Sequence, residues 1–160
     1  MGVLYAIVPV DDEIADYLRE MGESVPEADA APRNPTPREI RAVCDALPGQ
    51  RVHYSFKFGA FWQAVVEGAA DPEQEPWTLL NIAEFSGSED EPHPISFDKG
   101  WPSLILEIVR RLSVSCGPLA VIPDTGEAPI AVTGQDSIED LLGRWEHTRS
   151  PEGPGDTASS

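Results

Sequence analysis

The stretch Ile95–Val132 constrains the fold more than any other part of this sequence. Within it, apolar residues recur at helical spacing over Leu104–Leu112, and charged residues occupy the opposite side. Pro102 suits a first helical turn, and Gly117-Pro118 ends the helix because glycine tolerates the left-handed cap and proline cannot continue it. Short strand-like runs lie on both sides of the helix. We therefore predict a β-α-β-β unit, with a right-handed crossover if the flanking strands share a sheet.

The remaining chain alternates between further strand and helix patterns. Strands are predicted at Val3–Val8, Val52–Phe58, Phe61–Glu67, Trp77–Phe85 and Leu119–Ile122. Helices are predicted from Asp11 or Asp12 to Met21, from the Thr36 cap to Leu47, and from Asp136 or Ser137 to about His147. Trp77–Phe85 is apolar on both faces and is expected to be central, and Leu119–Ile122 is expected to be buried on both faces.

These patterns predict one α+β domain over residues 1–149. We expect an open, mainly antiparallel sheet of five or six strands with helices mainly on one face. The length of 160 residues and the 41% of hydrophobic residues fit a single core. Residues 150–160 contain no large apolar side chain, so we predict a disordered tail there.

The formal net charge of −17 narrows the range of partners. It argues against nucleic acid and against an anionic membrane surface, because both would repel the chain. It favours a basic protein partner, and solubility alone is the open alternative. No apolar run reaches transmembrane length and no basic leader opens the sequence, so we expect a cytoplasmic protein. Only two lysines stand beside nine arginines, which indicates a GC-rich bacterial source.

No metal or cofactor signature is present in the sequence. His53, His93 and His147 occur singly, without the paired spacing of a zinc site, and no glycine-rich phosphate loop can be found. The acidic runs lack the alternating oxygen ligands of a calcium loop. Cys44 and Cys116 are too few for a disulfide framework and lie beside apolar residues, so we expect buried free thiols.

Asp124-Thr125-Gly126 resembles the active-site motif of aspartic proteases. That resemblance implies two aspartates sharing a proton, which a single copy supplies only in a symmetric dimer. A plain turn between two strands explains the same three residues and is the favoured interpretation. A catalytic alternative groups Asp124 with His53 and Cys116 around one pocket, as a small enzyme or ligand-binding domain.

The sequence favours a non-enzymatic, acidic binding protein over an enzyme. In size and charge only, it resembles bacterial immunity proteins that mask a cationic toxin, since acidic surfaces steer such associations. Trp101 is either a core side chain, the favoured interpretation, or an exposed anchor, whereas Trp62 and Trp77 are expected in the core. An accessory subunit of a larger assembly is a third possibility. The predicted contact residues are Asp11, Asp12, Glu13, Glu73, Glu75, Glu89, Asp90, Glu91, Asp98 and Trp101.

Overall fold

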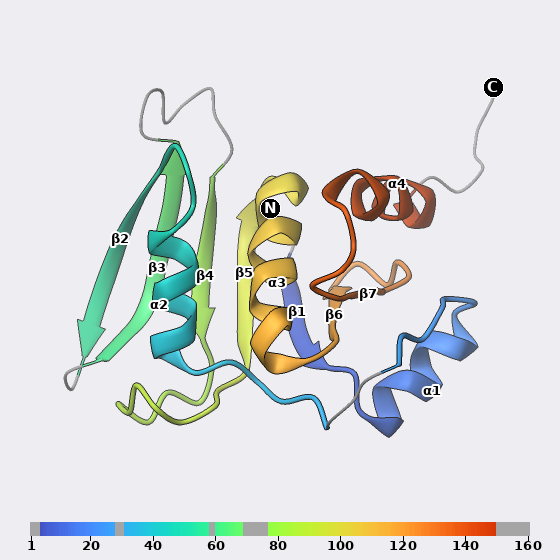
Figure 1. Cartoon of the computed structure of the whole chain (residues 1–160), viewed down its shortest axis with the longest axis horizontal. Helices are drawn as coiled ribbons and strands as arrows, with labels where there is room; N and C mark the ends of the chain where they lie inside the picture. Colours follow the sequence, from blue (N-terminus) through green and yellow to red (C-terminus); the bar gives the residue numbers. More distant parts are fainter. Residues whose placement is uncertain (1–3, 28–30, 58–59, 69–76, 150–160) are drawn as a thin grey trace.

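The computed structural model describes residues 4–27, 31–57, 60–68 and 77–149. Within these ranges it is an α+β protein built on one open, seven-stranded sheet with the order β2-β3-β4-β5-β1-β6-β7 (Figure 1). The strands are β1 Leu4–Pro9, β2 Gln50–Lys57, β3 Ala60–Gly68, β4 Thr78–Ile82, β5 Ile95–Gly100, β6 Leu119–Pro123 and β7 Ile130–Val132. The helices are α1 Asp12–Glu20, α2 Pro37–Asp45, α3 Pro102–Cys116 and α4 Ile138–Arg149.

The predicted fold class is confirmed, with one correction to the number of strands. Every hydrogen-bonded pair of neighbouring strands is antiparallel. The sheet has seven strands instead of five or six: β7, the last strand of the predicted β-α-β-β unit, pairs with β6 at the edge of the same sheet as the other strands. The predicted tail at 150–160 lies outside the described residues.

The β5-α3-β6 crossover organises the middle of the sheet as predicted. Both β5 and β6 pair antiparallel with β1, which lies between them, so β5 and β6 run parallel to each other. Figure 1 shows α3 in front of these strands, running back from the end of β5 to the start of β6, which makes the connection right-handed. Pro102 begins α3, and Gly117, with φ 83°, caps its end.

One face of the sheet carries the main core beneath α2, α3 and α4. The buried side of α3, which includes Ile105, Ile108 and Leu112, packs over alternate residues of the central strands. Trp145 of α4 lies against Tyr5 of β1 with ring centroids 5.2 Å apart. Buried apolar area of this kind contributes about 25 cal/mol per Å² and holds the three helices to the sheet.

α1 packs on the opposite face, where a second, smaller cluster forms. Ala15 and Leu18 contact this cluster together with Ala120 of β6 and Ala131 of β7. Because side chains alternate along a strand, Ala120 faces α1 while its neighbour Val121 belongs to the main core. The prediction that Leu119–Ile122 is buried on both faces is confirmed.

The prediction that Trp62 lies in the core is wrong because β2 and β3 form a β-bulge at this point. The register passes from Ser55 opposite Gln63 to Phe56 opposite Phe61, so Trp62 has no residue opposite it. Trp62 is 37% exposed, not buried. Phe56 is 53% exposed, and its ring is covered in part by the Arg41 guanidinium, 5.4 Å from the ring centroid.

Trp77–Phe85 is an interior strand as predicted, since β4 pairs with both β3 and β5. Its bounds, the burial of its second face and the core predictions for Trp77 and Trp101 need correction. β4 covers only Thr78–Ile82, and Leu79 and Asn81 on its second face are half-buried because no described helix covers that part of the sheet. Trp77 is likewise half-buried. Trp101 is 42% exposed at the N-cap of α3, so the core interpretation is wrong for this residue.

Candidate functional site

α1 is an acidic helix fixed to the sheet by its apolar side. The Asp11 carboxylate caps the helix by accepting a 2.9 Å hydrogen bond from the backbone N–H of Ile14. Asp12 and Glu13 follow in the first turn, where negative charge complements the helix dipole. Because Leu18 points into the sheet and is fully buried, the charged side chains of α1 face solvent.

The segment 11–27 carries a large excess of negative charge. Its seven carboxylates are Asp11, Asp12, Glu13, Asp16, Glu20, Glu23 and Glu27. Its one basic residue, Arg19, pairs with Asp16 at 2.9 Å, so seven negative charges less one positive charge leave minus six. Six of the seven carboxylates are exposed, and Glu23 is half-buried. We refer to residues 11–27 as the acidic segment.

The other arginines with described side chains are paired elsewhere in the fold. Their pairs are Arg33–Glu39, Arg38–Glu89, Arg38–Asp90, Arg41–Asp45, Arg51–Glu67, Arg110–Glu107, Arg111–Glu107 and Arg144–Asp136. These pairs lie on α2, α3, α4, β2 and β3 and on the loops beside them, so local cations offset much of the negative charge there. The acidic segment has no comparable set of cations within the described part of the chain.

The predicted contact residues Glu89, Asp90 and Glu91 lie in the β4–β5 loop and are partly engaged within the protein. Arg38 Nε donates to Asp90 Oδ1 at 2.8 Å, and Arg38 Nη2 lies 3.4 Å from Glu89. The hydrogen bond and charge of Arg38 lower the pKa of Asp90. Glu91 accepts a 2.8 Å hydrogen bond from Ser86 Oγ.

The predicted contact residues do not form one surface. Ile7 pairs with Ile95 and Leu4 with Asp98, so the run Asp11–Glu13 after β1 lies at the same end of the sheet as the loop before β5. Asp98 and Trp101 lie toward the opposite end of β5, about 10 Å further along the strand. Glu73 and Glu75 lie outside the described residues.

The three catalytic candidates are also separated. His53 is on edge strand β2, where Nε2 lies 3.0 Å from the Glu67 carboxylate. Five strand spacings, roughly 24 Å, separate β2 from β6. Cys116 precedes β6 and Asp124 follows it, so these two residues lie at opposite ends of that strand. The structure does not bring His53, Cys116 and Asp124 into one pocket.

Asp124-Thr125-Gly126 forms part of the connection between β6 and β7. The Asp124 backbone N–H donates to the Leu4 carbonyl at 2.9 Å, and its Oδ1 accepts from the Leu4 N–H at 3.2 Å. Gly126 adopts φ 86°, which glycine tolerates best. The geometry is that of the favoured turn interpretation, with Asp124 fastening the start of β1.

Both cysteines are buried free thiols, as predicted. Burial raises the pKa of Cys44 to about 12 and that of Cys116 to about 11. The nearby charge of Glu39 adds to the effect on Cys116, and Arg33 partly opposes it. Nucleophilic catalysis needs a lowered thiol pKa, so neither thiol is activated for it.

Sequence reasoning missed a serine–histidine–carboxylate contact in the β4–β5 loop. His93 is 3% exposed, and its Nε2 lies 2.9 Å from Ser86 Oγ and accepts the Ser86 N–H at 3.2 Å. In a hydrolytic triad the carboxylate orients the other ring nitrogen. Here Glu91 binds the serine instead, and His93 Nδ1 is buried without a protein partner. The contact therefore pins the loop and lacks the orientation of a triad.

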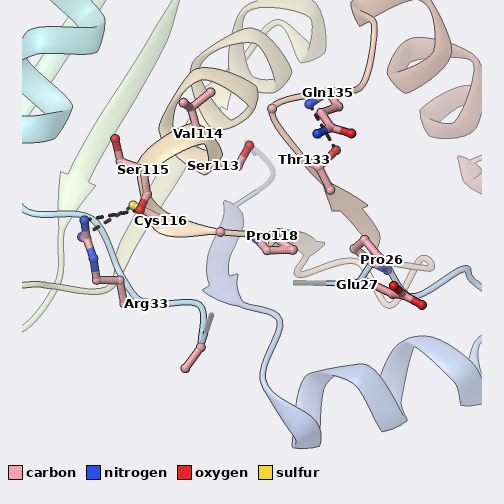
Figure 2. Close-up of a pocket in the computed structure, with 13 residues that line it drawn as sticks. Pro26, Glu27, Arg33, Ser113, Val114, Ser115, Cys116, Pro118, Thr133 and Gln135 are labelled. Carbon is pink, nitrogen blue, oxygen red and sulfur yellow. Dashed lines mark hydrogen bonds between the residues drawn. The ribbon is translucent and has the colours of Figure 1, made fainter. Parts of the chain in front are cut away.

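A second missed feature is a cavity of about 850 Å³ at the C-terminal end of α3 (Figure 2). Its wall includes Glu27, Arg33, Val114, Cys116 and Gln135. In Figure 2, Arg33 lies on one side of Cys116, and Glu27 lies across the view beside Pro26. The only local signal in the sequence was the helix end at Gly117-Pro118, because the other walls come from distant segments.

Metal-binding and membrane-spanning features are not found in the described ranges. No group of three or more histidine, cysteine, aspartate or glutamate residues there is placed to hold a metal ion. No described helix is long and apolar enough to cross a membrane. Comparison with known proteins found no matching family model, no matching curated protein and no matching solved structure.

Proposed function

We propose that this protein is a non-enzymatic, acidic binding protein of the bacterial cytoplasm that masks a basic protein partner. The immunity protein of a cationic toxin is the concrete form of this proposal. The observation that carries it is the uneven distribution of charge: the acidic segment holds seven carboxylates and one arginine, whereas the other described arginines with defined side chains pair elsewhere.

The acidic segment has the features of an electrostatic docking element. α1 is held by a small apolar cluster, so its backbone is fixed while its carboxylates extend into water. Carboxylates of one sign on a single element raise the association rate with a cationic partner and reject acidic ones. A surface that is charged for solubility alone needs no such asymmetry.

The placement of the paired arginines supports α1 over the β4–β5 loop as the principal contact. A partner that approached Glu89 or Asp90 would compete with Arg38, which already contacts both carboxylates. No such competition exists at Glu13 or Glu20, since neither takes part in an ion pair among the described residues. The β4–β5 loop lies at the same end of the sheet as α1, and we assign it a secondary contact with the partner.

Affinity capture from the native host at two ionic strengths tests the proposal. The tagged chain is used at about 0.01 M salt, where the Debye length is about 30 Å, and at about 1 M salt, where it is about 3 Å. We expect a protein of high isoelectric point that is retained at low salt and largely released at high salt. Recovery of only acidic or neutral proteins, or retention that does not change with salt, would overturn the proposal.

A further inference from the structure

Val114 lines the cavity at the C-terminal end of α3, and its backbone carbonyl lacks the usual helical donor. A helical carbonyl normally accepts from the N–H four residues later, but residue 118 is proline, so the Val114 carbonyl has no such donor. The last turn of this 15-residue helix carries no basic residue. Its C-terminus is the negative end of the helix dipole and favours a cation.

Arg33 hydrogen-bonds to two carbonyls at this helix end and to the Glu39 carboxylate. Its backbone N–H donates to the Cys116 carbonyl at 2.9 Å, and its guanidinium lies 3.5 Å from the Ser115 carbonyl. The same guanidinium is held by both oxygens of Glu39, at 2.8 and 2.6 Å. Glu39 therefore offsets the positive charge of Arg33, and the Val114 carbonyl is not reached by any hydrogen bond that the structure gives Arg33.

The remaining wall of the cavity is suited to a positively charged side chain with an aliphatic stem. Val114 is 73% exposed and offers an apolar surface for such a stem. Ser113 Oγ donates to the Arg110 carbonyl, which leaves its oxygen able to accept, and Gln135 adds an amide oxygen. Glu27 contributes a carboxylate at the rim. The volume is in the range of about 300–1,000 Å³ that is usual for small-ligand sites.

We propose that this cavity receives an arginine or lysine side chain of the basic partner. The inference rests on the proposed function, because the acidic segment ends in the cavity wall at Pro26 and Glu27. α1 would attract the partner over a distance, and the cavity would hold one of its cationic side chains. Binding energy at protein interfaces is concentrated in a few anchors of this kind, and arginine is enriched among them.

The test uses acetyl-arginine-methylamide as the probe and the ¹⁵N-labelled full chain as the receptor. We expect saturable amide shifts confined to residues that line the cavity, which are 113–117, 133–135 and Glu27, and none with the uncharged acetyl-norleucine-methylamide. Val114→Arg places a competing guanidinium at the site and should abolish the response, whereas Val114→Ala should retain it. Glu27→Gln should weaken binding by about two- to fivefold, the usual worth of an exposed charge pair.

Shifts scattered over the exposed carboxylates, equal shifts with the norleucine probe, or an unchanged response in Val114→Arg would each overturn the cavity proposal. Val114 is exposed on a helix, and arginine has a higher helix propensity than valine, so this variant should fold. A basic partner that binds wild type and Val114→Arg equally would overturn the cavity alone. Probe binding in the cavity without any basic partner in the capture experiment would overturn the proposed function and the assignment of the occupant to that partner, and would leave a guanidinium site in the cavity.

Discussion

Arg33 and Glu39 form a two-pronged ion pair in which Nη1 donates to Oε1 at 2.8 Å and Nη2 to Oε2 at 2.6 Å. Glu39 also completes a capping box, since its Oε1 accepts from the Thr36 backbone N–H while the Thr36 hydroxyl accepts from the Glu39 N–H. One carboxylate thus stabilises the start of α2 and fixes the arginine that serves the end of α3.

Glu39→Gln should lower the free energy of unfolding by about 1–2 kcal/mol at neutral pH, after allowance for solvent screening at this half-buried site. The hydrogen bond from Arg33 lowers the pKa of Glu39 from 4.5 to about 2. Because the folded pKa is depressed, the contribution is complete above pH 4.5 and is lost as the pH falls through about 2. Urea unfolding at several pH values should show wild type and variant converging in acid. A constant difference down to pH 2 would contradict this account.

Gly100→Ala should destabilise the fold by more than about 2 kcal/mol, because the glycine combines φ 119° with a close approach to β4. An added Cβ would lie 2.7 Å from the Trp77 carbonyl oxygen and closer still to the Thr78 side chain. Gly143→Ala is the matched control, since Gly143 lies in α4 with open space around it. This variant should raise the free energy of unfolding by up to about 1 kcal/mol. Thermal unfolding compares the stability changes of the two variants, and equal changes would contradict the close approach of Gly100 to β4.

Cys44 and Cys116 should resist alkylation by iodoacetamide in the native protein at about pH 8, because both thiols are buried and burial raises their pKa values from 9.0 to about 12 and about 11, which leaves almost no thiolate. Mass spectrometry should find two alkylated thiols only after unfolding. Reaction of Cys116 at the rate of a free cysteine in the folded chain would show that the end of α3 is open to reagent.

Asp124→Ala should lower the free energy of unfolding by about 0.5–1.5 kcal/mol, since it removes the side-chain acceptor for the Leu4 N–H. Asp124→Asn retains an oxygen at this position and should cost less. Urea unfolding separates the two variants. Equal losses would indicate that the charge of Asp124, and not its hydrogen bond, holds the start of β1.

The features predicted correctly from sequence are those that adjacent residues determine. The Thr36 capping box, the Pro102 start and the Gly117 cap of α3 depend on residues within one or two turns. The alternation and apolar runs that indicated most of the strands are equally local. The strand order is not local, because β1 is inserted between β5 and β6 only in three dimensions.

The features that were missed depend on pairing between distant segments. The exposure of Trp62 follows from a register shift against β2 that no periodicity reveals. The cavity at the end of α3 is assembled from residues near 27, 33, 114 and 134. The pairing of Glu89 and Asp90 with Arg38 joins residues about fifty positions apart, so net charge alone pointed to the loop and α1 equally.

The most direct test of the central claim compares the recovered partner's association with two matched double variants. Asp12→Asn/Glu13→Gln and Glu139→Gln/Asp140→Asn each remove two carboxylates from the first turn of a helix, α1 and α4 respectively. We predict that at low salt the α1 variant associates with the partner up to about tenfold more slowly, while the α4 variant matches wild type. Equal slowing by both variants, or none by the α1 variant, would contradict a contact at the acidic segment.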